Sequence, residues 1–155
     1  MTKIEYETHN ADETIAIGKQ ISKYLKPGMI IRLEGELGAG KTTITSGIAQ
    51  GFGISRYIKS PTYTIIREYT EGTIPLYHVD LYRLDENSAE EIGLDDYLYG
   101  DGVTVIEWGS VAEDSMPEEY LSITFEKPSE DLLSRKLVVE AKGDKYNQLM
   151  TNLSE

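Results

Sequence analysis

Apolar residues fall into short runs along this chain, and their spacing predicts alternating strands and helices. The run at 29–33 is compact and apolar, as in a buried strand, and residues 43–50 have helical spacing before Gly51 and Gly53. A second buried-strand run, Val-Thr-Val-Ile-Glu, occupies residues 103–107. This alternation indicates an α/β fold.

The remaining segments add elements before and after this core. Residues 3–7 alternate as a short strand, and Asn10 with Glu13 resembles a capping box for a helix that ends before Lys26-Pro27-Gly28. A further capping box at 88–91 predicts a short helix, and residues 145–153 suit a terminal helix.

Two hairpins are also expected. A strand-forming run through Tyr69, the turn Glu71-Gly72 and the run 74–84 indicate one hairpin, whose second strand ends near Asp80. The alternating segments 121–126 and 135–141 indicate the other. We therefore expect a single domain over residues 1–155, with a mixed sheet, flanking helices and added antiparallel strands.

The stretch 35–42, Gly-Glu-Leu-Gly-Ala-Gly-Lys-Thr, has the P-loop pattern of phosphate-binding proteins. In this motif backbone N–H groups surround a phosphate, Lys41 adds positive charge near the β- and γ-phosphates, and the Thr42 hydroxyl is placed to bind Mg²⁺. A glycine-rich turn with a surface lysine is the alternative interpretation. The apolar strand before the motif and the helix after it favour the P-loop.

Two predicted strands end in carboxylates. Glu107 ends the buried run 103–107 as the acidic residue of a Walker B strand does, and Asp80 ends a strand where a Mg²⁺-directed carboxylate is expected. The alternatives are a strand that simply reaches solvent at Glu107 and a turn-forming Asp80. His78 shares a strand face with Asp80, and we interpret it as a hydrogen-bonded structural imidazole. Trp108 is a residue type that usually serves packing.

Composition excludes several classes of protein. Fifteen basic and 27 acidic residues give a net charge of −12, which disfavours unaided binding to nucleic acid. The chain has no cysteine, so a disulfide framework and a thiolate metal site are excluded. No apolar segment approaches the ~20 residues that cross a bilayer, and no signal peptide is evident. We expect a cytoplasmic protein without a membrane partner.

Four sequence blocks carry a family resemblance. They are the P-loop, Ser60-Pro61-Thr62-Tyr63-Thr64, Tyr77-His78-Val79-Asp80-Leu81-Tyr82-Arg83-Leu84 and Glu107-Trp108. In this order and spacing the chain resembles the bacterial TsaE family, also called YjeE or YdiB, over nearly its whole length. The resemblance implies a small P-loop ATPase, with ATP and Mg²⁺ as cofactors. It would act with TsaB and TsaD to form N6-threonylcarbamoyladenosine at position 37 of ANN-decoding tRNAs, with TsaD as the transferase and tRNA reached only through the complex.

The same resemblance implies roles for individual residues. Phosphate contacts fall on Gly38, Ala39, Gly40, Lys41, Thr42 and Thr43. Metal binding falls on Thr42 and Glu107, with Asp80 beside them, and the catalytic residues are Lys41, Asp80 and Glu107. Ser60 to Thr64 looks like a switch loop, for which an ordinary hydroxyl-rich turn is the alternative. The family pattern also points to Asn10 and Thr14 near the adenine and to Arg135 near the nucleotide. Gly109-Ser110, after Glu107-Trp108, departs from the turn of many members.

Other nucleotide-dependent functions remain open at this point. A small-molecule kinase needs an acceptor pocket and often an arginine-bearing lid, whereas the arginines of this chain are scattered along the sequence. A nucleotide-gated binding module, in which hydrolysis is incidental, would use the loop 60–64 as its reporter. A regulatory GTPase is disfavoured, because no Asn-Lys-x-Asp element is present.

Overall fold

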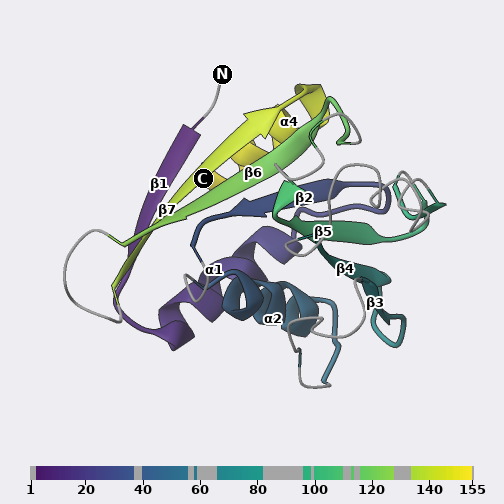
Figure 1. Cartoon of the computed structure of the whole chain (residues 1–155), viewed down its shortest axis with the longest axis horizontal. Coiled ribbons are helices and arrows are strands. Elements are labelled where there is room, and N and C mark those ends of the chain that lie inside the picture. Colours follow the sequence, from purple (N-terminus) through teal and green to yellow (C-terminus); the bar gives the residue numbers. More distant parts are fainter. Residues whose placement is uncertain are drawn as a thin grey trace.

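The computed structural model describes residues 3–36, 40–55, 58, 66–81, 96–98, 100–109, 113, 116–127 and 134–154. Its strands are β1 (Lys3–Thr8), β2 (Ile30–Glu34), β3 (Ile66–Tyr69), β4 (Leu76–Asp80), β5 (Val103–Glu107), β6 (Tyr120–Glu126) and β7 (Arg135–Lys142). Its helices are α1 (Ala11–Ser22), α2 (Lys41–Gly51) and α4 (Asp144–Ser154). The strands form one sheet in the order β1-β7-β6-β2-β5-β4-β3 (Figure 1).

The centre of this sheet is parallel. β6, β2, β5 and β4 run side by side in one direction, so their carboxyl ends share an edge. β2, β4 and β5 are buried along nearly their whole length. Burial on both faces explains why β2 and β5 appear in the sequence as compact apolar runs, although each also carries at least one charged residue.

Antiparallel strands extend the sheet on both sides. β3 pairs with β4 as the predicted hairpin, and β7 pairs with β6 and with β1. β1 and β6 alternate between more and less exposed residues, as strands with one solvated face do. The register places Thr8, at the end of β1, opposite Arg135, at the start of β7. Both therefore lie at the edge that holds the carboxyl ends of the parallel strands.

Helices α1, α2 and α4 cover one face of the sheet, called here the helix face. They share one apolar cluster with the strand residues that point to that side, including Ile31, Val105 and Val139. Figure 1 shows α1 and α2 side by side and α4 passing behind β6 and β7. The buried Tyr146 of α4 also accepts a 2.7 Å hydrogen bond from the backbone N–H of Ile30, which fixes α4 to the start of β2.

α1 and α2 approach each other closely because glycines line their contact. A Cβ at Gly18 would lie 2.5 Å from the carbonyl oxygen of Ile44, and one at Gly47 would lie 2.3 Å from that of Ile15. These distances leave no room for any side chain, so the helix separation requires glycine. We call Gly18 and Gly47 the glycine seam. Because α2 begins at Lys41, the seam joins α1 to the helix that follows the P-loop.

The opposite face of the sheet is more polar. It carries a small apolar cluster around Ile30, Val79 and Ile106. Beside this cluster, the guanidinium of Arg32 donates hydrogen bonds of 3.0 and 2.9 Å to the two carboxylate oxygens of Glu113 and lies 4.7 Å from the ring centroid of Tyr120. Arg32 is buried, whereas 62% of the Glu113 side chain is exposed. A buried cation is thus neutralised by a carboxylate at the surface.

The predicted α/β fold with a mixed sheet and added antiparallel strands is confirmed. The strand before the P-loop, the helix after it, both hairpins and the terminal helix all form, with ends that differ from the predicted ones by at most two residues. The loop 60–64 and the helix expected at 88–91 lie outside the described residues. None of the helices in the described part is long and apolar enough to cross a membrane.

Candidate functional site

Lys41 begins α2 at the edge where the parallel strands end. Gly40, just before it, has φ of 113°, a left-handed conformation that favours glycine. Lys41 is only 4% exposed, and its Nζ donates a 2.7 Å hydrogen bond to the carbonyl oxygen of Gly35. The first glycine of the P-loop pattern and its lysine are therefore joined across the loop.

Three carboxylates lie within electrostatic reach of the Lys41 charge. Burial lowers the pKa of the Lys41 amine, and the negative charges of Glu107, Asp80 and Glu34 oppose this shift. Asp80 and Glu107 are directly opposite each other on the adjacent parallel strands β4 and β5. The N–H of Leu81 donates a 3.1 Å hydrogen bond to the Glu107 carbonyl oxygen, so the two strand ends are held together. The sheet thus places Asp80 and Glu107 side by side, within electrostatic reach of Lys41, and the metal-binding and catalytic roles of these residues stay predictions.

Glu107 has a buried partner on the neighbouring strand. His78 is fully buried, Glu107 is 3% exposed, and His78 Nε2 is hydrogen-bonded to Glu107 Oε2. The expectation of a hydrogen-bonded imidazole at His78 is confirmed. Its partner was not predicted, although the shared strand face of His78 and Asp80 was a signal that His78 points toward this edge.

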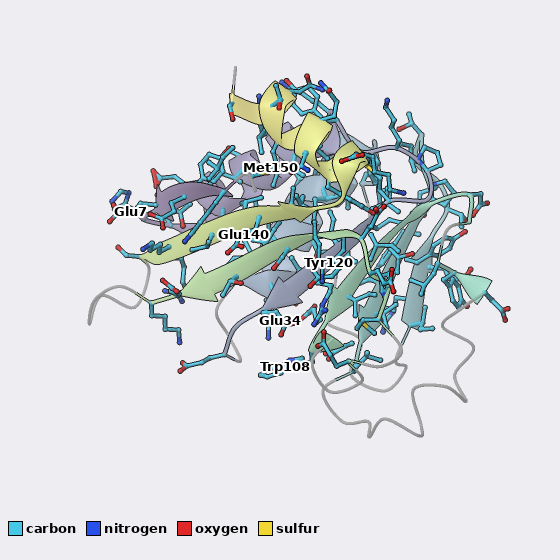
Figure 2. All side chains as sticks on the ribbon, turned by 90° about the horizontal axis from the view of Figure 1, so that it is seen from above. Glu7, Glu34, Trp108, Tyr120, Glu140 and Met150 are labelled. Atoms are coloured by element: carbon cyan, nitrogen blue, oxygen red, sulfur yellow. The ribbon has the colours of Figure 1, made fainter. Side chains whose placement is uncertain are left out.

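Trp108 covers the lysine. The Lys41 Nζ lies 3.8 Å from the centroid of the indole ring, a cation–π contact. Trp108 has φ of 62°, which is rare for a bulky residue and typical of strained positions at functional sites. Figure 2 shows Trp108 near Glu34, at the carboxyl ends of β5 and β2. The contact with Lys41 was missed, because nothing in the sequence indicates the backbone turn that brings the ring back over the lysine.

The start of α2 is suited to an anion. Backbone N–H groups in the first turn of a helix have no partner within the helix, and they lie at its positive end. α2 has no acidic residue in its first turn and no side-chain cap at Gly40. Thr42 and Thr43 are half-buried there. Gly38 and Ala39 lie outside the described residues, so their predicted phosphate contacts stay predictions.

The oxygen groups at this edge fit a hard divalent cation. Carboxylates of Glu107 and Asp80 and the hydroxyl of Thr42 are ligands of the kind that Mg²⁺ accepts. Within the described part of the chain, no group of three or more histidine, aspartate or glutamate residues is arranged to hold a metal. Mg²⁺ at nucleotide sites takes only one or two carboxylates and completes its octahedron with phosphates and water. Two strand-end carboxylates therefore suffice.

The three outlying candidates lie at the same edge but are already engaged. The Asn10 side chain accepts a 2.9 Å hydrogen bond from the Glu13 N–H and caps α1. The buried Thr14 hydroxyl bonds to that of Thr8 at 3.0 Å, and Arg135 Nη1 donates to the Ser134 carbonyl oxygen at 2.7 Å. These contacts build the corner between β1, α1 and β7. Contacts of the three residues with a nucleotide stay predictions.

Comparison with known proteins places this arrangement in a family. The family model described as "Threonylcarbamoyl adenosine biosynthesis protein TsaE" matches residues 8–137. The chain belongs to the TsaE family. A relative from Bacillus subtilis, named tRNA threonylcarbamoyladenosine biosynthesis protein TsaE, is 44% identical over 154 residues, covering 99% of this chain and 96% of the relative. A protein of the same name from Nostoc is 42% identical over 127 residues, or 79% of this chain and 76% of the relative.

A solved structure similar to this chain has the same fold. The crystal structure of Bacillus subtilis YdiB matches with a TM-score of 0.87 and 40% sequence identity, covering 99% of this chain and 95% of that one. The resemblance to the TsaE family deduced from four short blocks is therefore confirmed over the whole chain. The match also supports a P-loop-type α/β architecture for the edge that holds Lys41, Asp80 and Glu107.

Proposed function

We propose that this chain is a Mg²⁺-dependent P-loop ATPase that serves in the formation of N6-threonylcarbamoyladenosine on ANN-decoding tRNAs, in the cytoplasm, together with TsaB and TsaD. The observation that carries the proposal is the set of residues at the edge where the parallel strands end. Lys41 stands at the amino end of α2, within electrostatic reach of two carboxylates that end adjacent parallel strands. Membership in the TsaE family supports the pathway.

The residues divide the work of phosphoryl transfer. Because the transition state of this reaction is loose, it calls for positioning and neutralisation of charge rather than covalent chemistry. The N–H groups at the start of α2 and the Lys41 ammonium bind the β- and γ-phosphates. Thr42 and Glu107 hold the metal, which when bound neutralises charge developing on the phosphate oxygens. Asp80 orients the attacking water beside the metal.

The contacts of the Lys41 side chain support its role in binding phosphate. The Lys41 ammonium contacts the Gly35 carbonyl oxygen and the Trp108 ring. Phosphate oxygens are stronger partners for an ammonium than a neutral carbonyl is, because both partners then carry charge. We therefore expect phosphate oxygens to compete with the Gly35 carbonyl oxygen for the Lys41 ammonium.

Stimulation comes from a protein surface rather than from bare tRNA. The net charge of −12 disfavours direct docking on a phosphate backbone, where affinity depends on lysine and arginine displacing counterions. Arg32, which is buried, is hydrogen-bonded to Glu113 on the opposite face of the sheet and so is not directed at the proposed phosphate site. A partner protein can supply a positive group to the γ-phosphate in trans. TsaB and TsaD are the proposed partners.

Steady-state ATP turnover tests the proposal. It is measured at fixed salt with the protein alone, with tRNA, with TsaB and TsaD, and with all components. We expect slow turnover alone, little change with tRNA, and stimulation by the two proteins. Stimulation by bare tRNA equal to that of the full mixture would contradict the role of the protein partners. Transfer of phosphate to a metabolite, rather than to water, would indicate the kinase alternative.

The two strand-end carboxylates are tested separately. Asp80→Asn and Glu107→Gln each remove one negative charge at nearly constant volume. We expect both to lower Mg²⁺-dependent hydrolysis and Glu107→Gln to raise the Mg²⁺ concentration needed for half-maximal rate. If both variants hydrolyse ATP normally, these carboxylates are structural and the proposed mechanism is wrong.

A further inference from the structure

The buried contact between His78 and Glu107 is unusual for the centre of this sheet. The His78 side chain is completely buried, with an exposed fraction of 0%. Its neighbours along β4, Leu76 and Val79, are apolar and equally buried. Burying a polar ring among such residues is costly unless its nitrogens are hydrogen-bonded. A structural role alone would be met more simply by an apolar side chain.

One ring nitrogen is bonded and the other is not. Nε2 contacts Glu107 Oε2, whereas Nδ1 is buried without a hydrogen-bond partner among the described residues. The carboxylate form of Glu107 can only accept hydrogen bonds, so the tautomer that completes this contact is the one that carries its proton on Nε2. All of the polar bonding of the ring is thus directed at a single carboxylate oxygen.

The register explains how the ring reaches Glu107. His78 is opposite Val105, and Glu107 is two residues farther along β5 on the same face. Glu107 in turn is opposite Asp80, at the edge where the P-loop lysine lies. The imidazole therefore contacts the carboxylate from the core side and leaves the other side of Glu107 to the nucleotide edge.

We propose that His78 is a positioning residue for Glu107. It holds Oε2 by a hydrogen bond from Nε2–H, so that Oε1 is kept in the orientation that a metal at the nucleotide edge requires. The inference rests on the proposed function, because only in that function does Glu107 bind a metal. His78 does not touch the nucleotide itself, since both of its nitrogens are enclosed in the core. Partners that orient metal ligands in this way typically change metal affinity or activity by about 10–100-fold when they are removed.

Three substitutions separate positioning from packing. His78→Leu introduces an apolar side chain of similar size and removes the donor. His78→Gln places an amide N–H near the position of Nε2, whereas His78→Asn places one near that of Nδ1, out of reach of Glu107. Thr104→Val is the matched control, because Thr104 is equally buried on β5 and its hydroxyl bonds to the Tyr97 carbonyl oxygen away from the site.

Metal binding is read directly with Mn²⁺ as the probe. Electron paramagnetic resonance gives the Mn²⁺ affinity of each protein–ADP complex, and a fluorescent ADP analogue gives nucleotide affinity in EDTA. We expect His78→Leu and His78→Asn to lose about 10-fold or more in Mn²⁺ affinity. His78→Gln and Thr104→Val should stay near the wild type. Nucleotide affinity in EDTA should change less than about 2-fold in all four variants, because the P-loop is intact.

Each outcome decides a different claim. Equal Mn²⁺ affinity of the wild type and His78→Leu would overturn the inference. If His78→Leu fails to fold by circular dichroism, the comparison of His78→Gln with His78→Asn decides, and equal affinities there overturn it. A wild-type protein that binds ADP in EDTA but no Mn²⁺ in the complex would overturn the proposed metal site, and the inference with it. Rescue by glutamine but not by asparagine supports it.

Discussion

The two faces of the sheet treat polar groups in different ways. On the helix face, His78 and Glu107 are enclosed together within an apolar layer. On the same face, the backbones of α1 and α2 are in direct contact at the glycine seam. On the opposite face, Arg32 reaches a carboxylate that is mostly in water, and β1, β7 and β6 carry exposed charges such as Glu7 (Figure 2). Contacts on the first face leave little freedom for substitution, whereas those on the second are screened by solvent. The comparison predicts that substitutions on the helix face change the free energy of unfolding more than substitutions on the opposite face do.

The largest effect on stability is expected at the glycine seam. Alanine is favoured over glycine in a helix by about 1 kcal/mol. At Gly47, however, the added Cβ would lie 2.3 Å from the Ile15 carbonyl oxygen. Gly47→Ala should therefore lower the free energy of unfolding by about 1–3 kcal/mol, the usual cost of overpacking. Urea unfolding followed by circular dichroism measures it.

Gly53→Ala is the matched control for the seam. Gly53 has φ of 83° and no atom within 4 Å of an added Cβ. Its substitution carries only the cost of a left-handed backbone, about 1–2 kcal/mol. A Gly47→Ala protein more stable than the wild type would show that α1 and α2 can separate freely, which would remove the contrast between the two faces.

A smaller, pH-dependent effect is expected for Glu113. The hydrogen bonds from Arg32 lower the pKa of the Glu113 carboxyl. A carboxyl whose pKa is lowered by folding stabilises the protein above its unfolded pKa of about 4.3, and this contribution is lost as the pH falls through the folded value. Because Glu113 is largely exposed, Glu113→Gln should cost only about 1 kcal/mol at pH 7.

Unfolding by urea at pH 7 and again below pH 4 checks the origin of this effect. The difference between the wild type and Glu113→Gln should shrink in acid, since the wild-type carboxyl is then protonated too. A difference that stays constant with pH would mean that the charge of Glu113 is irrelevant and that the amide disturbs packing instead.

The smallest effect is expected on the outer strands. Glu5 and Lys136 form a 3.6 Å ion pair in which both side chains are 39–50% exposed. Exposed pairs contribute about 0–1 kcal/mol. Glu5→Gln should therefore shift the free energy of unfolding by less than about 0.5 kcal/mol, and added salt should reduce even that. A loss as large as that of Gly47→Ala would reverse the order of the two faces.

The sequence predicts the centre of the molecule better than its corners. The strand 103–107 and the P-loop with its flanks follow from local patterns, because strands buried on both faces of a parallel sheet are rich in apolar residues. The common edge of Asp80 and Glu107 follows from parallel pairing. The pairing of β1 with β7 joins residues more than 120 positions apart, and no local pattern specifies it.

Two contacts of the site were also beyond sequence reasoning. The position of the Trp108 ring over Lys41 depends on one left-handed backbone conformation, which residue type does not indicate for tryptophan. The bond between His78 and Glu107 depends on strand register. Asn10 was predicted as a helix cap and serves as one, because capping is a local interaction between neighbouring residues.

Equilibrium titration with a fluorescent ADP analogue and Mg²⁺ tests the central claim most directly, which is that the edge around Lys41 binds nucleotide. The proteins are the wild type, Lys41→Ala and, as a control, Lys19→Ala on the exposed side of α1. Loss of a charged hydrogen-bond donor costs about 1.5–3 kcal/mol, so Lys41→Ala should bind at least about 10-fold more weakly. Lys19→Ala should match the wild type, with circular dichroism unchanged in all three. Equal binding by Lys41→Ala and the wild type would contradict the account.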